Sequence, residues 1–169
     1  MPPELLFNLQ DVDLSKVVAD KAAIEQVIPH RFEMMHLTGI VLIDPVQQIA
    51  VGYKDATPEE FWVRGHMPGF PLMPGVIMCE AAAQLMTYYV TSLKLVKGSL
   101  IVFGGMDNVR FRGQVKVGDR FVIVCKATKI HPRQIASSVQ GFVKDTMVFQ
   151  GDFMGIPITP PQEGERAQP

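Results

Sequence analysis

The sequence predicts an α+β fold in which a curved antiparallel sheet wraps around one long, apolar central helix. Two strand-like runs around a turn come first, a long and almost wholly apolar helical segment follows, and further strand-like runs complete the chain. A sheet needs a second layer to bury its apolar face, and a helix with so little polar surface is suited to that place. This order of elements therefore favours a sheet closed around a buried helix.

The first 27 residues are expected to be an N-terminal extension that contains an extra helix. Apolar residues recur at roughly helical spacing from Leu14 to Ile28. Asp13 is a candidate N-cap for this helix, and Pro29 is its expected stop.

The main domain is expected to span residues 28–156, followed by a flexible C-terminal tail at 157–169 that is rich in Pro and charge. Its first hairpin is predicted around the turn at Asp44-Pro45. The other strands follow the central helix as an antiparallel meander. The predicted strands are residues 40–43, 48–53, 100–103, 109–111, 120–128, 135–143 and 146–154.

The central helix is predicted to begin after a stretch of Gly and Pro at residues 65–75 that cannot form regular structure. It continues from Val76 to about Leu93 and is apolar almost all round, as expected of a helix inside a domain. Two strongly polar side chains, Glu80 and Gln84, interrupt its first part.

The composition indicates one ordinary globular domain, since the 169 residues are 47% hydrophobic and 20% charged. A net charge of -1 without a run of Lys or Arg does not favour a nucleic-acid partner. The first residues lack the features of a secretory signal, and no segment approaches the roughly 18 apolar residues of a membrane span. We therefore expect a cytoplasmic protein without a membrane partner.

The two cysteines, Cys79 and Cys125, lie outside any spacing typical of zinc sites or redox pairs. We expect both to be buried, reduced thiols. His66 and Glu80 have neither a second carboxylate nor a His-x-x-x-His spacing beside them, so we expect neither a metal nor a cofactor.

Glu80 is the first candidate for chemistry, because a carboxylate on an apolar helix is costly unless it is paired, hydrogen-bonded or protonated. Gln84 follows one helical turn later and could orient it. Burial on the apolar helix is expected to raise the pKa of Glu80, which would keep it protonated. A buried structural hydrogen-bond pair is the alternative.

His66 is the candidate general base, because the Gly and Pro around it can hold one imidazole rigidly. Structural or surface roles are expected for His30, His36 and His131. The backbone N–H of Gly75, at the start of the helix, could bind a carbonyl oxygen on which negative charge develops, although Pro-Gly commonly just starts a helix.

The segment Gly65-His66-Met67-Pro68-Gly69-Phe70-Pro71-Leu72-Met73-Pro74-Gly75-Val76, followed by Glu80-Ala81-Ala82-Ala83-Gln84, resembles the central motif of the bacterial 3-hydroxyacyl-acyl carrier protein dehydratases of fatty acid synthesis. The likeness extends to Ile28-Pro29-His30-Arg31-Phe32, Val109-Arg110-Phe111-Arg112 and Val117-Gly118-Asp119. It covers about Ile28 to Phe153.

This resemblance implies a hot-dog fold and a hydro-lyase of lipid metabolism that forms trans-2-enoyl thioesters. It implies that His66 removes the C2 proton, Glu80 protonates the leaving 3-hydroxyl, Gly75 N–H binds the thioester oxygen and Gln84 supports Glu80. It also implies a homodimer or trimer of dimers whose active sites combine His66 of one subunit with Glu80 of the other. The glutamate at position 80 favours simple dehydration, because the isomerising class of the family typically has Asp there.

The resemblance also implies acyl carrier protein as the partner, which presents the acyl chain on phosphopantetheine. Arg110 and Arg112 alternate along a strand and are candidates for binding the acidic carrier or the phosphate, although ordinary solvated charges are the alternative.

Two departures from the family pattern fall in segments that could line the acyl tunnel or the dimer seam: residues 33–39, and Met67 where Phe is common. Two other functions are therefore considered. A hot-dog acyl thioesterase would use a carboxylate to activate water, but it leaves His66 without a clear role. A non-catalytic acyl-thioester binding protein would retain the pocket without turnover.

Overall fold

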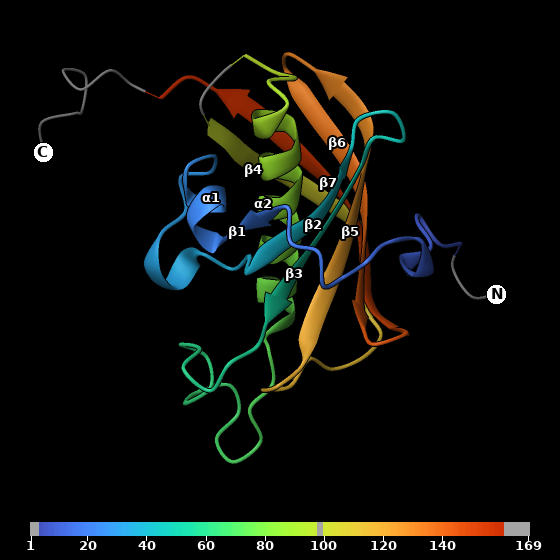
Figure 1. Cartoon of the computed structure of the whole chain (residues 1–169). Helices are drawn as coiled ribbons and strands as arrows, with labels where there is room; N and C mark the ends of the chain where they lie inside the picture. Colours follow the sequence, from blue (N-terminus) through green and yellow to red (C-terminus); the bar gives the residue numbers. More distant parts are fainter. Residues whose placement is uncertain (1–3, 98–99, 161–169) are drawn as a thin grey trace, which may run out of the picture.

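The computed structural model describes residues 4–97 and 100–160. Its seven strands form one sheet in the order β1-β2-β3-β5-β6-β7-β4, with antiparallel pairing throughout. This sheet curves around α2, as Figure 1 shows, and the predicted hot-dog architecture is confirmed. The elements are β1 (Ala19–Asp20), α1 (Lys21–Glu25), β2 (Gly39–Asp44), β3 (Ile49–Asp55), α2 (Gly75–Ser92), β4 (Leu100–Phe111), β5 (Arg120–His131), β6 (Gln134–Val143) and β7 (Thr146–Ile158), with 3-10 turns at Leu9–Asp11 and Phe32–Met34.

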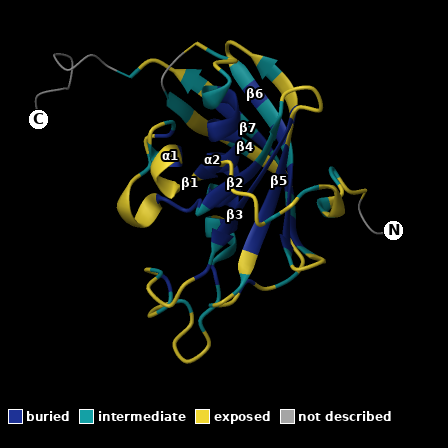
Figure 2. Cartoon of the chain, viewed as in Figure 1, coloured by how far each residue is buried: buried dark blue, intermediate teal, exposed yellow. Residues whose placement is uncertain are grey.

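The central helix is buried along most of its length, as its apolar composition predicts. Its side chains from Met78 to Val90 are buried apart from Glu80, and they form the main core with the inner face of the sheet. Figure 2 shows this burial along α2, while the loop between β3 and α2 is largely exposed. Glu80 is therefore the one partly exposed side chain of this helix between Met78 and Val90.

The N-terminal segment differs from the expected helix over Leu14 to Ile28. The chain forms strand β1 at Ala19–Asp20 just after Val18, whose N–H donates to Ile40 O at 2.8 Å, and the helix begins only at Lys21. Asp20 caps this helix by accepting from Ala23 N at 2.9 Å, whereas Asp13 accepts from Ser15 N in a local turn. Pairing with the edge of β2 overrides the local helical pattern.

The residues before β1 cover the outer face of the sheet, opposite α2 (Figure 1). Gln140 ties this segment down: its Oε1 accepts from Leu6 N at 2.9 Å, and its Nε2 donates to Glu4 O at 2.7 Å. A second apolar cluster forms under the segment. It joins Leu6, Phe7, Leu9, Val12 and Leu14 to the outward-facing residues Val41, Val51, Val122, Val124 and Phe142.

Two strand boundaries differ from the sequence-based expectation. The two short runs predicted between residues 100 and 111 form a single strand, β4, in which pairing with β7 shifts register between Phe103 and Gly105 and again between Asp107 and Arg110. These irregularities interrupt the alternating pattern without ending the strand. At the other end, β7 continues to Ile158, so the first residues of the expected tail are paired strand; residues 161–169 lie outside the described part.

The cysteines are free and buried, as expected. Burial raises the pKa of Cys79 to about 11 and that of Cys125 to about 12, so both stay as thiols near neutral pH. Among the described helices, none is long and apolar enough to cross a membrane.

Candidate active site

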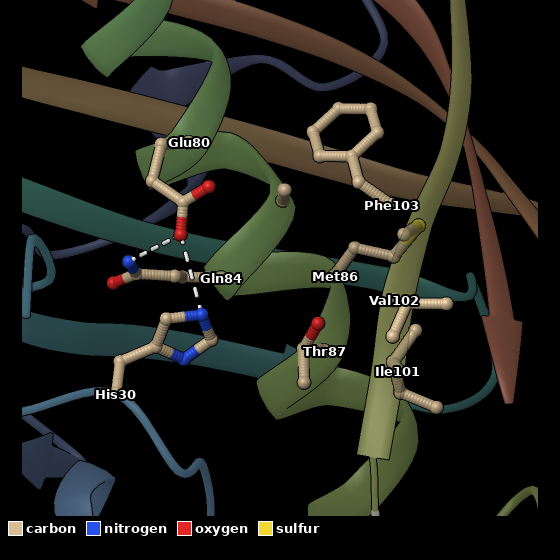
Figure 3. Close-up of a pocket in the computed structure, with 9 residues that line it drawn as sticks. His30, Glu80, Gln84, Met86, Thr87, Ile101, Val102 and Phe103 are labelled. Carbon is tan, nitrogen blue, oxygen red and sulfur yellow. Dashed lines mark hydrogen bonds and ion pairs between the residues drawn. The ribbon is translucent and has the colours of Figure 1, made fainter. Parts of the chain in front are cut away.

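Glu80 projects from α2 into a cavity of about 60 Å³ (Figure 3). Its Oε1 accepts a hydrogen bond from Gln84 Nε2 at 2.8 Å and lies 3.2 Å from His30 Nε2. The side chains of His30 and Glu80 are each 24% exposed, so solvent reaches this carboxylate. Other lining residues come from α2 and from the edge strand β4, including Thr87, Ile101, Val102 and Phe103.

Gln84 uses its whole amide to hold this arrangement. Its Nε2 donates to Met34 O at 2.7 Å as well as to Glu80, and its Oε1 accepts from His36 N at 2.9 Å. Because Gln84 is fully buried, these bonds fix the segment before β2 against the helix. Gln84 thus contacts Glu80 through a direct hydrogen bond, in the arrangement that their spacing on the helix predicts.

The prediction that burial raises the pKa of Glu80 is wrong. The hydrogen bond from His30 is the largest influence and holds the pKa of Glu80 below its ordinary value of 4.5, with the bond from Gln84 acting in the same direction. Burial acts the other way but is outweighed. The apolar helix alone indicated desolvation, whereas the two donors that stabilise the anion became visible only in the fold.

His66 lies in the loop between β3 and α2, where backbone contacts restrain it. Its N–H donates to Trp62 O at 2.7 Å, and its ring Nδ1 lies 2.9 Å from Leu72 O. A carbonyl partner requires the proton on Nδ1, which leaves Nε2 as an acceptor in the neutral ring. That is the form of imidazole that can remove a proton.

His66 and Gly75 line a second, mainly apolar cavity of about 330 Å³. Phe111, the last residue of β4, forms another wall: a Cβ added to Gly75 would lie 2.8 Å from its ring. The first N–H groups of α2 have no acceptor inside the helix, so Gly75 can present its N–H to a bound group.

The structure does not bring His66 and Glu80 into one cavity of the described chain. The Glu80 cavity meets β4 at Ile101, Val102 and Phe103, whereas the His66 cavity meets it at Phe111. The two predicted reactive groups therefore line separate cavities that both touch the edge strand β4.

Arg110 and Arg112 are both exposed. The Arg112 Nε donates to Gln150 Oε1 at 3.1 Å, and Gln150 is the strand partner of Arg110. The two arginines thus share a face of the sheet, as their spacing predicts, while Phe111 between them packs against Phe149.

His30 and His36, two histidines close to Glu80, are predicted from the sequence to have structural or surface roles. His30 instead contacts Glu80 directly, and the only sequence signal for it was its place in the Pro29-His30-Arg31 segment. His36 is 1% exposed, and burial lowers its pKa to about 4, so it is neutral at ordinary pH. Within residues 4–97 and 100–160, no group of three or more His, Cys, Asp or Glu side chains could hold a metal ion.

The sheet and the helix define a hot-dog-fold protein, and its polar groups form a candidate acid–base site. Residues 28–152 match the model of the FabA-like domain. The chain is 34% identical over 135 residues to the 3-hydroxyacyl-[acyl-carrier-protein] dehydratase FabZ of Moorella thermoacetica, an overlap of 80% of this chain and 94% of that protein. It is 36% identical over 137 residues to the FabZ of Desulfotalea psychrophila, covering 80% of this chain and 91% of that protein.

Solved structures share the fold at much lower identity. The dehydratase heterocomplex ApeI:P from Xenorhabdus doucetiae has a TM-score of 0.68 at 14% identity, over 84% of this chain and 93% of that one. A sigma28-regulated virulence protein from Campylobacter jejuni has a TM-score of 0.65 at 17% identity, over 88% and 97% of the two chains. This chain belongs to the FabA-like family. The central motif predicts this family and a dehydratase, which is a hydro-lyase, and both predictions are confirmed.

Proposed function

We propose that this dehydratase acts on 3-hydroxyacyl chains carried by acyl carrier protein and releases trans-2-enoyl thioesters. The observation that carries the proposal is the separation of a His66 half-site from a Glu80 half-site along the free edge strand β4. An elimination of water needs a base at C2 and an acid at the 3-hydroxyl of the same bound chain.

In the proposed reaction, Nε2 of His66 takes the proton from C2 while the N–H of Gly75 stabilises the charge that develops on the thioester oxygen. The C3–O bond then breaks, and the departing oxygen takes a proton from Glu80 and leaves as water. Gln84 keeps the Glu80 carboxyl aimed at the substrate. The apolar walls around His66 would surround the acyl chain.

The two half-sites would be joined by a second copy of the chain. β4 lies at one edge of the sheet and pairs only with β7 among the strands that the structure describes, and it carries the exposed apolar residues Val102, Phe103, Met106 and Phe111. If two copies of β4 pair antiparallel about a twofold axis near the middle of the strand, Phe111 of one copy lies beside Val102 of the other. That pairing would join the His66 cavity of one subunit to the Glu80 cavity of its partner.

The carrier would bind beside the end of β4. Arg110 and Arg112 are exposed there and could pair with the acidic carrier or with the phosphate of its phosphopantetheine arm. Replacing both arginines with Glu should weaken carrier binding, while turnover of a substrate on free pantetheine stays near that of the parent. Unchanged carrier affinity would remove these residues from the proposal.

The first test is the appearance of enoyl-thioester absorbance when purified protein meets a short 3-hydroxyacyl-carrier substrate. His66→Ala and Glu80→Gln should each lower kcat by about 10² or more, since positioned acid and base groups contribute that much. His131→Ala is the matched control, because this histidine is exposed at the end of β5. A parent that is inactive on carrier and CoA substrates of several chain lengths, with its fold intact, would contradict the proposal.

The shared site has its own test, which mixes unfolded His66→Ala and Glu80→Gln chains and refolds them together. In a mixed dimer one site holds both changes and the other holds neither, so random pairing should restore about a quarter of the parent activity. Sites contained within single chains would give no recovery. Light scattering on the same samples distinguishes a dimer from a trimer of dimers.

A further inference from the structure

We propose that His30 is the proton partner of Glu80: its imidazole returns a proton to the Glu80 carboxyl after each elimination. This inference rests on the proposed function and adds a group to its acid half-site. It makes His30 a positioning residue that acts through Glu80 and does not touch the substrate.

The reaction itself creates the need for such a group. Each elimination moves the C2 proton to His66 and the Glu80 proton to the departing oxygen, so the site ends with an imidazolium and a carboxylate. Before another turnover, Glu80 must gain a proton and His66 must lose one. Because the pKa of Glu80 lies below its ordinary value, the carboxylate stays ionised after it has lost its proton, and a donor beside it would speed the return of that proton.

The geometry places His30 in that position. Its Nε2 lies 3.2 Å from Glu80 Oε1, within reach of a direct proton transfer (Figure 3). In the proposed step, His30 starts as the imidazolium: its Nε2–H bond breaks as an O–H bond forms on Glu80, which leaves neutral His30. His66 then releases its extra proton to solvent and His30 takes one up from solvent, so that the cycle balances. The cavity of about 60 Å³ beside the pair has room for water, and His30 is partly exposed.

The backbone that carries the His30 imidazole is held by the next residue, Arg31. The guanidinium of Arg31 donates to Ile28 O at 2.7 Å, to Glu25 O at 2.7 Å and to the carbonyl of His30 itself. These bonds join the backbone at His30 to the end of α1. This support fixes the backbone from which the His30 ring reaches Glu80 on α2.

The other titratable groups around Glu80 are less suited to this task. His36, from the segment before β2, is buried, and burial with the nearby charge of Lys54 lowers its pKa to about 4. Lys54 is itself paired with Glu60 at 2.6 Å. Gln84 donates but has no proton to transfer, and β4 contributes only Ile101, Val102 and Phe103 to the cavity. Among the residues that the structure describes, His30 is the one acid–base group in direct contact with Glu80.

The test compares His30→Gln and His30→Ala with the parent, and His131→Gln serves as the control. Glutamine keeps a donor near Glu80 but cannot transfer a proton, so kcat should fall by at least about 10-fold with little change in KM. Alanine leaves space for added imidazole, which should raise the kcat of this variant and not that of the parent. A structural role alone would leave His30→Gln as active as the parent and His30→Ala without rescue, and that result would overturn the proposal.

A second readout does not depend on turnover. Carbon-13 NMR of the Glu80 carboxyl should show its pKa moving up in His30→Gln and further in His30→Ala, because the main influence that lowers it is removed. If this shift appears but the parent forms no enoyl product, the proposed function fails while the pairing of His30 with Glu80 stands. If the parent is active and the Glu80 titration is the same in all variants, the pairing fails and the proposed function stands.

Discussion

The ring of Phe111 lies against Gly75, so that a Cβ at position 75 would be 2.8 Å from its nearest ring carbons. This contact joins the start of α2 to the end of β4 and leaves the first N–H of the helix open to the His66 cavity. No side chain other than hydrogen fits at this position without moving the ring.

We therefore expect Gly75→Ala to lower kcat/KM by at least about 10-fold, because the displaced ring would narrow the cavity beside the N–H that is proposed to bind the thioester oxygen. Phe111→Ala in the same chain should recover part of the loss. Steady-state kinetics of the two single variants and the double variant measure this coupling. Gly65→Ala is the control, since nothing lies within 4 Å of a Cβ there; an equal loss in that variant would contradict the steric explanation.

Gln84→Leu should cost both stability and activity. The change removes the hydrogen bonds of Gln84 to His36 N–H, Met34 C=O and the Glu80 carboxylate. Each group left unsatisfied should lower the free energy of unfolding by about 1–3 kcal/mol. We expect a lower denaturant midpoint and a kcat reduced by about 10-fold or more. Thr91→Val on the same helix is the matched control. A variant that unfolds like the parent would show that these bonds contribute little.

The buried His36 predicts a loss of stability in mild acid. The unfolded chain protonates this histidine near its ordinary pKa of 6.5, whereas the folded chain does so only near 4. Between these values the unfolded state binds more protons, so the free energy of unfolding should fall as the pH drops from about 6.5 to 4, by at most about 3 kcal/mol.

Urea titrations at several pH values measure this dependence. His36→Leu should flatten the curve in that window, while His131→Leu, at an exposed position, should leave it unchanged. If the parent and His36→Leu have the same pH dependence, His36 is not the group responsible.

The N-terminal segment should stabilise the protein without contributing to its chemistry, because it covers the sheet face opposite α2. A chain that begins at Ser15 should expose the outer apolar cluster, lose about 2 kcal/mol or more of unfolding free energy and bind a hydrophobic dye. Its initial dehydratase rate should stay near that of the parent.

Gln140→Leu removes only the two side-chain hydrogen bonds that hold the segment to the sheet. It should lower the free energy of unfolding by about 1 kcal/mol for each bond. Thermal melts of both variants provide the comparison. Unchanged melting temperature in the shortened chain would mean that the segment is not held to the sheet in solution.

The local sequence pattern by itself determined the main elements of the fold and the family of this protein. The apolar run after Pro74 predicts α2, and helical periodicity places Glu80 and Gln84 one turn apart on one face, so their hydrogen bond was foreseeable. The alternating runs predict most of the strands, and the long motif around His66 predicts the family that the comparisons confirm. Each of these features depends on residues close together in the chain.

The tertiary structure decided what depends on residues far apart. Ala19 and Asp20 pair with β2 as strand β1, although their local pattern is helical. His30 reaches Glu80 across 50 positions of sequence and reverses the expected direction of its pKa shift. Periodicity reports which face of an element is buried, but the charge state of a group depends on the donors that the fold brings to it. That is why the sequence singled out Glu80, while only the folded chain placed His30 beside it.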